Sequence, residues 1–407
     1  MKRSLAAALD RVFGEEGSVA ADPKVQVVMA ATGIAITGLY LVSPIVSVLT
    51  GPFAVSEAAA GQLVTAFTAP SIVFIPVFGV LADRHGKRPI LVGGLLAIGL
   101  GGAAVALAPT FEVAMAFRVV QGVGYAAVNP IGVAIIGDAY AGSRETTAQG
   151  LRVVSIQTAG LIAPAVAGVL VVAAWQYPFL LYLLALPVAA WAHRTLPRSA
   201  AAGTSSIRSY LADLRSSLST MALGAVVLSF IPRFTLSFAL VAYVSVVLAR
   251  LGASSVIIGG VVALIGLVSL LASTQAGRVT TRFDPLHALL GGFLALGGGM
   301  VALGIAASYA LVGVGVLAVG VGIGLSGPIQ KSLVTQLAPP DVRTGTVSSA
   351  LVFQSIGAAG GPLLMGLALQ YAEVGATFVA FGLAFGTIGA ILTLVAGRAD
   401  RRRIGST

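Results

Sequence analysis

The sequence predicts an all-α integral membrane protein with twelve transmembrane helices in two pseudo-symmetric six-helix bundles. Three observations predict this fold class: the apolar composition, twelve apolar stretches of spanning length, and a repeat that relates the two halves of the chain. Of the 407 residues, 57% are hydrophobic and 9% are charged, and the mean hydropathy is +0.99. One soluble core cannot bury so much apolar surface, so a soluble globular protein is excluded.

The rest of the composition agrees with this fold class. The 51 Gly and 18 Pro stand largely inside long apolar runs, where helices packed in lipid tolerate them. Because the chain has no cysteine, disulfides and cysteine-ligated metals are excluded, and we expect neither a metal nor another cofactor. A net charge of +10 would suggest a nucleic-acid partner for a soluble protein, but the positions of the charges indicate a membrane orientation instead.

A transmembrane helix needs about 20 apolar residues to cross a hydrocarbon core of ~30 Å. Twelve stretches between charged, proline and turn residues fit this length. They are 25–50, 57–82, 89–108, 111–136, 147–173, 177–194, 219–249, 254–277, 286–307, 309–334, 345–371 and 374–396.

The basic residues predict how these spans are oriented. An even number of spans places both termini on one side of the membrane. On that side lie 19 Lys and Arg, whereas Arg250 lies on the other side and four lie within the spans. Since cytoplasmic loops carry the excess of Lys and Arg, we predict a multi-pass protein of a prokaryotic cytoplasmic membrane with both termini in the cytoplasm.

Composition also divides the chain into segments. Residues 1–24 are too polar for a cleavable signal peptide, and the linker between the halves contains an expected surface helix near Tyr210 and Leu214. The segments are a cytoplasmic arm at 1–24, a six-helix bundle at 25–194, a cytoplasmic linker at 195–218, a second bundle at 219–396 and a cytoplasmic tail at 397–407.

An internal repeat relates the two bundles at a constant offset of 198 residues. The matching pairs are Gly79 and Gly277, Arg84 and Arg282, Gly122 and Gly320, Gly124 and Gly322, Pro130 and Pro328, Pro164 and Pro362, and Gly168 and Gly366. Glycine is common in this chain, but the Pro and Arg pairs at the same offset are not expected by chance. The spacing therefore indicates two duplicated six-helix units in parallel orientation.

The loop between the second and third spans reads GVLADRHGKRP at residues 79–89. It resembles the cytoplasmic signature loop of the major facilitator superfamily, Gly-x-x-x-Asp-Arg-x-Gly-Arg/Lys-Arg/Lys. The matching residues are Gly79, Asp83, Arg84, Gly86, Lys87 and Arg88. Gly86 permits a tight turn with positive φ, and we expect Asp83 to meet a helix N-terminus or a cation across the interface between the halves. The second-half copy has Thr281 in place of this aspartate.

The fourth span carries a second resemblance. Residues 118–127, RVVQGVGYAA, are similar to the Arg-x-x-Gln-Gly-x-Gly pattern of the drug/proton antiporter branch of the superfamily, which has twelve helices. A cation in the middle of a bilayer costs about 3 kcal/mol or more and so faces a cavity or a partner. Arg118 is therefore a candidate for proton transfer or substrate contact, and a structural tether to Gln121 or to a carbonyl group is the alternative.

The fifth and eleventh spans read GLIAPAVAG at 160–168 and AAGGPLLMG at 358–366. Both resemble the antiporter-associated Gly-Pro-x-x-Gly-Gly signature, although Ala163, Ala167 and Met365 replace glycine. Small residues let helices approach closely, and proline bends a helix. We expect such packing or kinks at Pro164, Gly168, Pro362 and Gly366.

The resemblance implies a central cavity lined mainly by spans 1, 4, 7 and 10. Arg233 lies in the middle of span 7 and is the second candidate for substrate contact. Asn129 precedes Pro130 and either faces the substrate or caps a carbonyl group that the proline frees. Tyr40 and Gln157 are further candidates, although aromatic and amide groups also serve in ordinary helix packing.

The other charged residues of the spans are expected at the membrane surfaces. Arg152 and Lys331 should snorkel toward the cytoplasmic face. No Asp or Glu stands in the middle of a predicted span, although antiporters of this branch often use a buried carboxylate. Glu57 and Glu112, at external ends, are the nearest candidates for proton binding.

The resemblance covers residues 25–396 and implies a secondary transporter that rocks two bundles about a central site. We favour proton-coupled efflux of small amphipathic, drug-like compounds by a monomer, with the substrate, protons and the lipid bilayer as its partners. An organic-anion carrier that uses Arg118 and Arg233 is the alternative, and a non-transporting membrane sensor is a remote one. We expect no enzyme, because no catalytic or nucleotide motif occurs in its required context.

Overall fold

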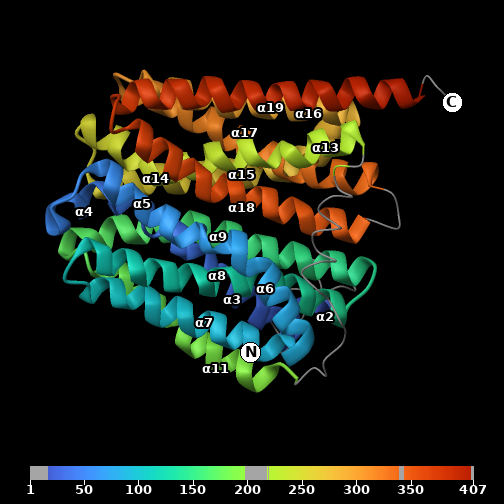
Figure 1. Ribbon diagram of the computed structural model, residues 1–407, viewed down its shortest axis with the longest axis horizontal. Coiled ribbons are helices and arrows are strands. Elements are labelled where there is room, and N and C mark those ends of the chain that lie inside the picture. Colours follow the sequence, from blue (N-terminus) through green and yellow to red (C-terminus); the bar gives the residue numbers. More distant parts are fainter. Residues whose placement is uncertain (1–16, 198–217, 219, 339–342, 405–407) are drawn as a thin grey trace.

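The computed structural model describes residues 17–197, 218, 220–338 and 343–404, and it folds them into helices without a strand (Figure 1). The helices of the first half are α2 (Gly17–Ala21), α3 (Pro23–Tyr40), η2 (Ser43–Ile45), α4 (Val46–Phe53), α5 (Glu57–Thr68), α6 (Pro70–His85), α7 (Lys87–Ala104), η3 (Val105–Leu107), α8 (Phe111–Ala139), α9 (Ser143–Ala173), α10 (Tyr177–Leu180), η4 (Leu181–Leu184) and α11 (Ala185–Thr195). Those of the second half are α13 (Met221–Leu228), α14 (Phe230–Arg250), α15 (Ser255–Arg282), α16 (Pro285–Gly304), α17 (Tyr309–Leu337), α18 (Arg343–Ala368) and α19 (Val374–Ile404).

These helices confirm the predicted membrane spans. Within the described residues, eleven stretches are helical, long and apolar enough to cross a membrane. The remaining predicted span, the sixth, is built from the short helices α10, η4 and α11 in succession. The first span is also interrupted, because α3 ends before Pro44 and the chain passes through η2 into α4.

The two ends of the described chain lie at the same end of the molecule. Helix α2 and the C-terminal end of α19 are on this side, which we call the termini side, and α4 is on the opposite side, which we call the far side (Figure 1). Helix α19 runs to Ile404, so it extends through most of the segment expected to be a tail at 397–407. The surface helix expected near Tyr210 lies outside the described residues.

Helix caps repeat at the same 198-residue offset as the motifs. Ser56 caps α5 and Ser254 caps α15, each by accepting a hydrogen bond from a backbone N–H three residues later. Thr110 and Ser308 cap α8 and α17 in the same way. Because such side chains satisfy backbone N–H groups that the first helical turn leaves free, the duplicated sequence starts equivalent helices at equivalent residues.

Equivalent glycines also make equivalent contacts in the two halves. A Cβ atom on Gly124 would lie 2.4 Å from the carbonyl oxygen of Gly94, and one on Gly322 would lie 2.8 Å from that of Gly292. Both pairs differ by 198 residues, and in both cases only a glycine lets the two helices approach so closely. The predicted pseudo-symmetric pair of six-helix bundles is therefore confirmed.

The halves meet through two interfaces that the repeat relates to each other. In one, α9 packs on α15, and a Cβ on Gly168 would stand 2.4 Å from the carbonyl oxygen of Ser255. In the other, α18 packs on α5, and a Cβ on Gly366 would stand 1.9 Å from the side-chain nitrogen of Gln62. The sequence predicted that Gly168 and Gly366 let helices approach closely. In the structure the helices that approach there belong to different halves.

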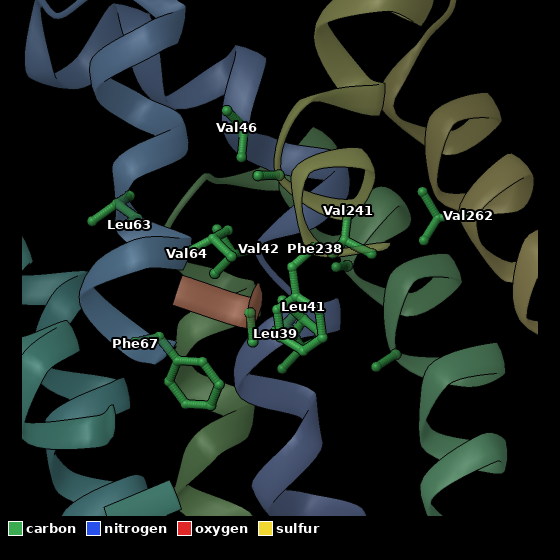
Figure 2. Close-up of a cluster of buried hydrophobic side chains, with 14 of the residues drawn as sticks. Leu39, Leu41, Val42, Val46, Leu63, Val64, Phe67, Phe238, Val241 and Val262 are labelled. Carbon is green, nitrogen blue, oxygen red and sulfur yellow. The ribbon is translucent and has the colours of Figure 1, made fainter. Parts of the chain in front are cut away.

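Apolar side chains from both halves fill the region where the first span is interrupted. Figure 2 shows Leu39, Leu41 and Val42 beside Phe238 and Val241 of α14, with Val262 of α15 nearby. All six belong to one buried cluster. These side chains therefore pack the two halves against each other beside the interruption of the first span.

Candidate functional site

A cavity of about 260 Å³ lies between the two halves. Its walls come from α3, α8 and α9 of the first half and from α14, α15, α17 and α18 of the second. Three cationic side chains line it, those of Arg152, Arg233 and Lys331, and no Asp or Glu occurs among the described lining residues. The four spans predicted to line the cavity, 1, 4, 7 and 10, all contribute lining residues. Spans 5, 8 and 11 contribute lining residues as well.

Arg233 is held in place by α17. Its Nε donates a hydrogen bond to the hydroxyl of Ser326 at 2.7 Å, and its Nη2 donates one to the carbonyl oxygen of Ile323 at 3.1 Å. A Cβ on Gly327 would stand 2.8 Å from Nη2, so this glycine makes room for the guanidinium group. Arg233 is 9% exposed, and its position in the cavity agrees with the sequence prediction.

Arg152 is held in place by two amides of the first half. Its Nη1 donates to the side-chain oxygen of Asn129 at 2.9 Å, and its Nε donates to that of Gln149 at 3.0 Å. Asn129 lines the cavity, and its side-chain oxygen accepts from Arg152; capping a carbonyl group would require its amide nitrogen as the donor, and no such bond joins it to a described residue. Asn129 therefore orients a cavity cation, which is a role that the sequence did not indicate.

Lys331 lies two helical turns beyond Ile323 on α17 and one turn beyond Gly327. Residues four apart share one face of a helix, so Lys331 lies next along the face on which the Arg233 guanidinium rests. Its side chain is exposed and lines the cavity, and no hydrogen bond or ion pair joins it to another described residue. Arg152 and Lys331 were expected nearer the cytoplasmic face, with snorkelling side chains, and the structure adds that both line the cavity.

The remaining cavity surface combines aromatic and small polar groups. Tyr40 and Gln157, both predicted candidates, line the cavity together with Tyr125. On the other wall, the rings of Phe234 and Phe238 lie 5.9 Å apart between centroids. Such a lining suits an amphipathic molecule with an apolar body and charged groups.

Arg118 lies outside the cavity, in the core of the first half, and is 0% exposed. It donates to the carbonyl oxygens of Leu63 at 3.1 Å and Gly38 at 2.7 Å and to the side-chain oxygen of Gln121. Its guanidinium carbon also stands 4.7 Å from the ring centre of Phe67. The expectation of a cavity-lining Arg118 is corrected, since the guanidinium group ties three spans together.

The signature loop is formed as expected at its turn. Gly86 has φ 86°, in the region that favours glycine. Lys87 forms an ion pair with Asp138 at the end of α8, and Arg88 donates to the carbonyl oxygen of Leu196 at 3.3 Å. Both contacts stay within the first half. Asp83 makes no hydrogen bond or ion pair with another described residue.

The carboxylates nearest to the far side remain apart from the cavity. Glu57 and Glu112 each stand in the first turn of their helices, where a negative charge favours the helix N-terminus. Neither is among the described residues that line the cavity.

Hydrogen bonds between the halves gather around Tyr243 of α14. Its hydroxyl donates to the carbonyl oxygen of Ala58 at 3.0 Å, and it accepts from Gln62 at 3.2 Å. Gln62 also donates to the carbonyl oxygen of Pro362 at 3.2 Å, and Thr68 donates to that of Ala358.

All of these bonds lie at the middle of the molecule or toward its far side. On the termini side, Lys331 and the cavity residues Val133 and Val153 are exposed. The structure is therefore closed on the far side and accessible from the termini side, which agrees with the lack of a hydrogen bond or ion pair between Asp83 and a described residue of the other half.

We expect Tyr243→Phe to shift the protein toward the state that is open on the far side. The substitution removes a hydroxyl that joins α5 to α14, and the net loss of about 1 kcal/mol per hydrogen bond changes the ratio of the two states about fivefold. Because the chain has no cysteine, spin labels on G150C and T281C, both exposed on the termini side, report the distance between the halves by pulsed electron resonance. The population with a short distance should grow.

Ser245→Ala is the matched control for this measurement. Ser245 lies two residues further along the same helix, and its buried hydroxyl has no hydrogen-bond partner among the described residues. Its removal should leave the distance distribution unchanged. Equal distributions for Tyr243→Phe and the parent protein would show that the hydroxyl does not hold the halves together.

Sequence reasoning missed Lys331 and Tyr125. The repeat offered a signal for Lys331, since Asn129 and Gly327 are an equivalent pair and Lys331 stands one turn beyond Gly327. Tyr125 stands one helical turn before Asn129 on α8, so the two side chains share a face of the helix. This spacing could have indicated that Tyr125 lines the cavity.

Comparison with known proteins identifies the family. The family model described as Major Facilitator Superfamily matches residues 28–362. The "Bacillibactin exporter" of Bacillus subtilis (strain 168) is 32% identical over 149 residues, which are 35% of this chain and 37% of that protein. "Multidrug transporter protein MdtP" of the same organism is 30% identical over 122 residues, 30% of this chain and 23% of that protein. The matched segments thus span less than half the length of these two curated relatives.

Solved structures with the same fold cover nearly the whole chain. A bacterial homologue of the human lysosomal transporter Spinster, crystallised in an inward-facing and unoccupied conformation, has a TM-score of 0.72 and 17% identity over 92% of this chain and 96% of its own. The D-xylose–proton symporter has a TM-score of 0.76 and 17% identity over 93% and 97%. At this identity they establish the fold alone. With the family model matching most of its length, the chain belongs to the Major Facilitator Superfamily and is a multi-pass membrane transporter.

Proposed function

We propose that this protein exports small amphipathic organic anions through its central cavity. The observation that carries the proposal is the charge of the cavity, which has Arg152, Arg233 and Lys331 on its walls and no carboxylate among its described lining residues. A cavity of one sign attracts ions of the opposite sign. The aromatic side chains of the lining provide surfaces for an apolar body.

The outward direction rests on the relatives and on the membrane potential. Two of the relatives are named as an exporter and a multidrug transporter. A membrane potential that is negative inside favours the exit of anions by about 2.3 kcal/mol per charge per 100 mV. Export of an anion therefore requires no protonated carboxylate, and the absence of such a group among the described cavity residues is consistent with it.

The proposed setting is the cytoplasmic membrane, with the termini side facing the cytoplasm. The distribution of 19 basic residues on one side and Arg250 on the other supports this orientation. One chain builds the whole cavity, which supports a monomer as the working unit. In this orientation the structure is the state that receives substrate from the cytoplasm.

Proton-coupled efflux of drug-like compounds is the second candidate. The name of the multidrug relative and the aromatic lining favour it. Unlike the anion proposal, it requires that neutral or cationic compounds bind.

Three probes with the same carbon skeleton test these candidates. We expect 2-naphthoate to bind the purified protein at least tenfold more tightly than 2-naphthylmethylamine or 2-naphthylmethanol, as measured by titration calorimetry. In proteoliposomes, naphthoate should move toward the positive side of an imposed potassium diffusion potential, and a pH gradient at zero potential should concentrate it no more than in protein-free liposomes. Tighter binding of the amine, or binding of none of the three, would refute the anion proposal, and transport of the amine against a pH gradient would support the second candidate.

A further inference from the structure

We infer that the preferred substrate carries two separated acidic groups, one for each half of the protein. The inference rests on the proposed function and makes its substrate class more specific. Of the three cavity cations, Arg152 belongs to the first half, whereas Arg233 and Lys331 belong to the second. A single carboxylate neutralises one of these charges and leaves the others without a counter-ion.

Both arginines are oriented before a substrate arrives. Two nitrogens of each guanidinium group donate to fixed acceptors, on Asn129 and Gln149 for Arg152 and on Ser326 and Ile323 for Arg233. In the described part of the chain, neither remaining terminal nitrogen donates a hydrogen bond. Each arginine thus offers one nitrogen from a fixed position, which reduces the ordering cost of binding an acidic group.

The three cavity cations are carried by different halves of the protein. Arg152 lies on α9 and donates to Asn129 of α8, whereas Arg233 lies on α14 and donates to α17, the helix that also carries Lys331. A molecule with an acidic group at each end gives each half one counter-ion and leaves one of the three cations unneutralised, whereas a single carboxylate leaves two. Its rigid body would then lie against the aromatic side chains between them, such as Tyr40 and Phe234.

Positive charge on both halves also makes closure of the termini side depend on bound substrate. The halves are separated on the termini side, and closing that side brings Arg152 nearer to Arg233 and Lys331. Like charges that approach in a poorly solvated space repel each other. An acidic group bound at each wall removes this repulsion, so the loaded protein closes more readily than the empty one.

Isomeric dicarboxylates test the inference. We expect naphthalene-2,6-dicarboxylate, with its acids at opposite ends, to bind at least tenfold more tightly than 2-naphthoate. The 2,3-isomer has the same charge with its acids at one end, and it should bind at least fivefold more weakly than the 2,6-isomer. Calorimetry on the purified full-length protein gives all three affinities.

Two substitutions assign the acidic groups to the walls. R152Q should lower the affinity for the 2,6-isomer at least tenfold and change the affinities for the 2,3-isomer and for naphthoate by less than threefold. K331Q should weaken all three acids, and since Lys331 is exposed and has no described partner, this variant should melt at the same temperature as the parent.

The outcomes separate the inference from the proposed function. Equal affinities for naphthoate and the 2,6-isomer, or an equal effect of R152Q on every acid, would overturn the two-acid inference and leave the anion transporter standing. If no acid binds at all, both fail together.

Discussion

Replacing Arg118 by methionine is expected to destabilise the first six-helix bundle by about 3 kcal/mol or more, because three hydrogen bonds from a charged donor are lost and each contributes about 1.5–3 kcal/mol. The lost donors serve the carbonyl oxygens of Gly38 and Leu63 and the side chain of Gln121. In the apolar surroundings of these helices, water cannot take the place of the guanidinium group. Thermal unfolding of the detergent-solubilised protein measures the effect.

Arg250→Met is the control for this prediction. Arg250 is exposed at the end of α14, and a surface substitution changes stability by about 0.5 kcal/mol or less. If Arg118→Met melts like the parent protein and only transport is lost, the role first indicated by the sequence, in proton transfer or substrate contact, would replace the structural one.

Replacing Arg233 by glutamine is expected to lower the affinity for acidic probes about 100-fold, since a hydrogen bond to a charged group contributes about 1.5–3 kcal/mol. The charge lost is one that α17 holds in place through Ser326 and Ile323. Naphthoate binding, measured by calorimetry, and its counterflow in proteoliposomes should fall together, while the binding of neutral probes should not change.

Arg233→Lys separates charge from geometry in this experiment. Lysine keeps the positive charge, but it lacks the planar fork that reaches two acceptors at once, so it should restore about a tenth of the affinity. Arg282→Gln, which removes an exposed cation at the end of α15, should have no effect. An Arg233→Gln variant that binds acids as tightly as the parent would show that the cavity is not the anion site.

The spans and the repeat were predictable because their signals are local or periodic. A run of about 20 apolar residues has one stable arrangement in a bilayer, which is a helix that satisfies its own backbone. The 198-residue offset placed glycines and prolines in pairs, and the structure adds the paired caps Ser56 and Ser254. The even number of spans predicted the common side of the termini in the same way.

The site was predictable only in part. Arg233 was found because an uncompensated charge in the middle of a span must face a cavity or a partner, and its distance from both ends of the span was readable. The same reasoning singled out Arg118, but it does not tell whether a buried arginine faces a cavity or a partner group within the protein. For Arg118 the partners are carbonyl groups of Gly38 and Leu63 on other helices, and a backbone acceptor leaves no mark in the sequence.

By itself, therefore, the sequence determined the membrane fold, its two related halves and the placement of both termini at one end of the molecule, since these depend on hydrophobicity and spacing along the chain. Only the tertiary structure decided which cations share a cavity. It separated Arg118 from the cavity and brought Arg152 and Lys331 into it with Arg233. The physical reason is that a buried charge is stabilised by whatever group packs against it, and packing joins residues far apart in the chain.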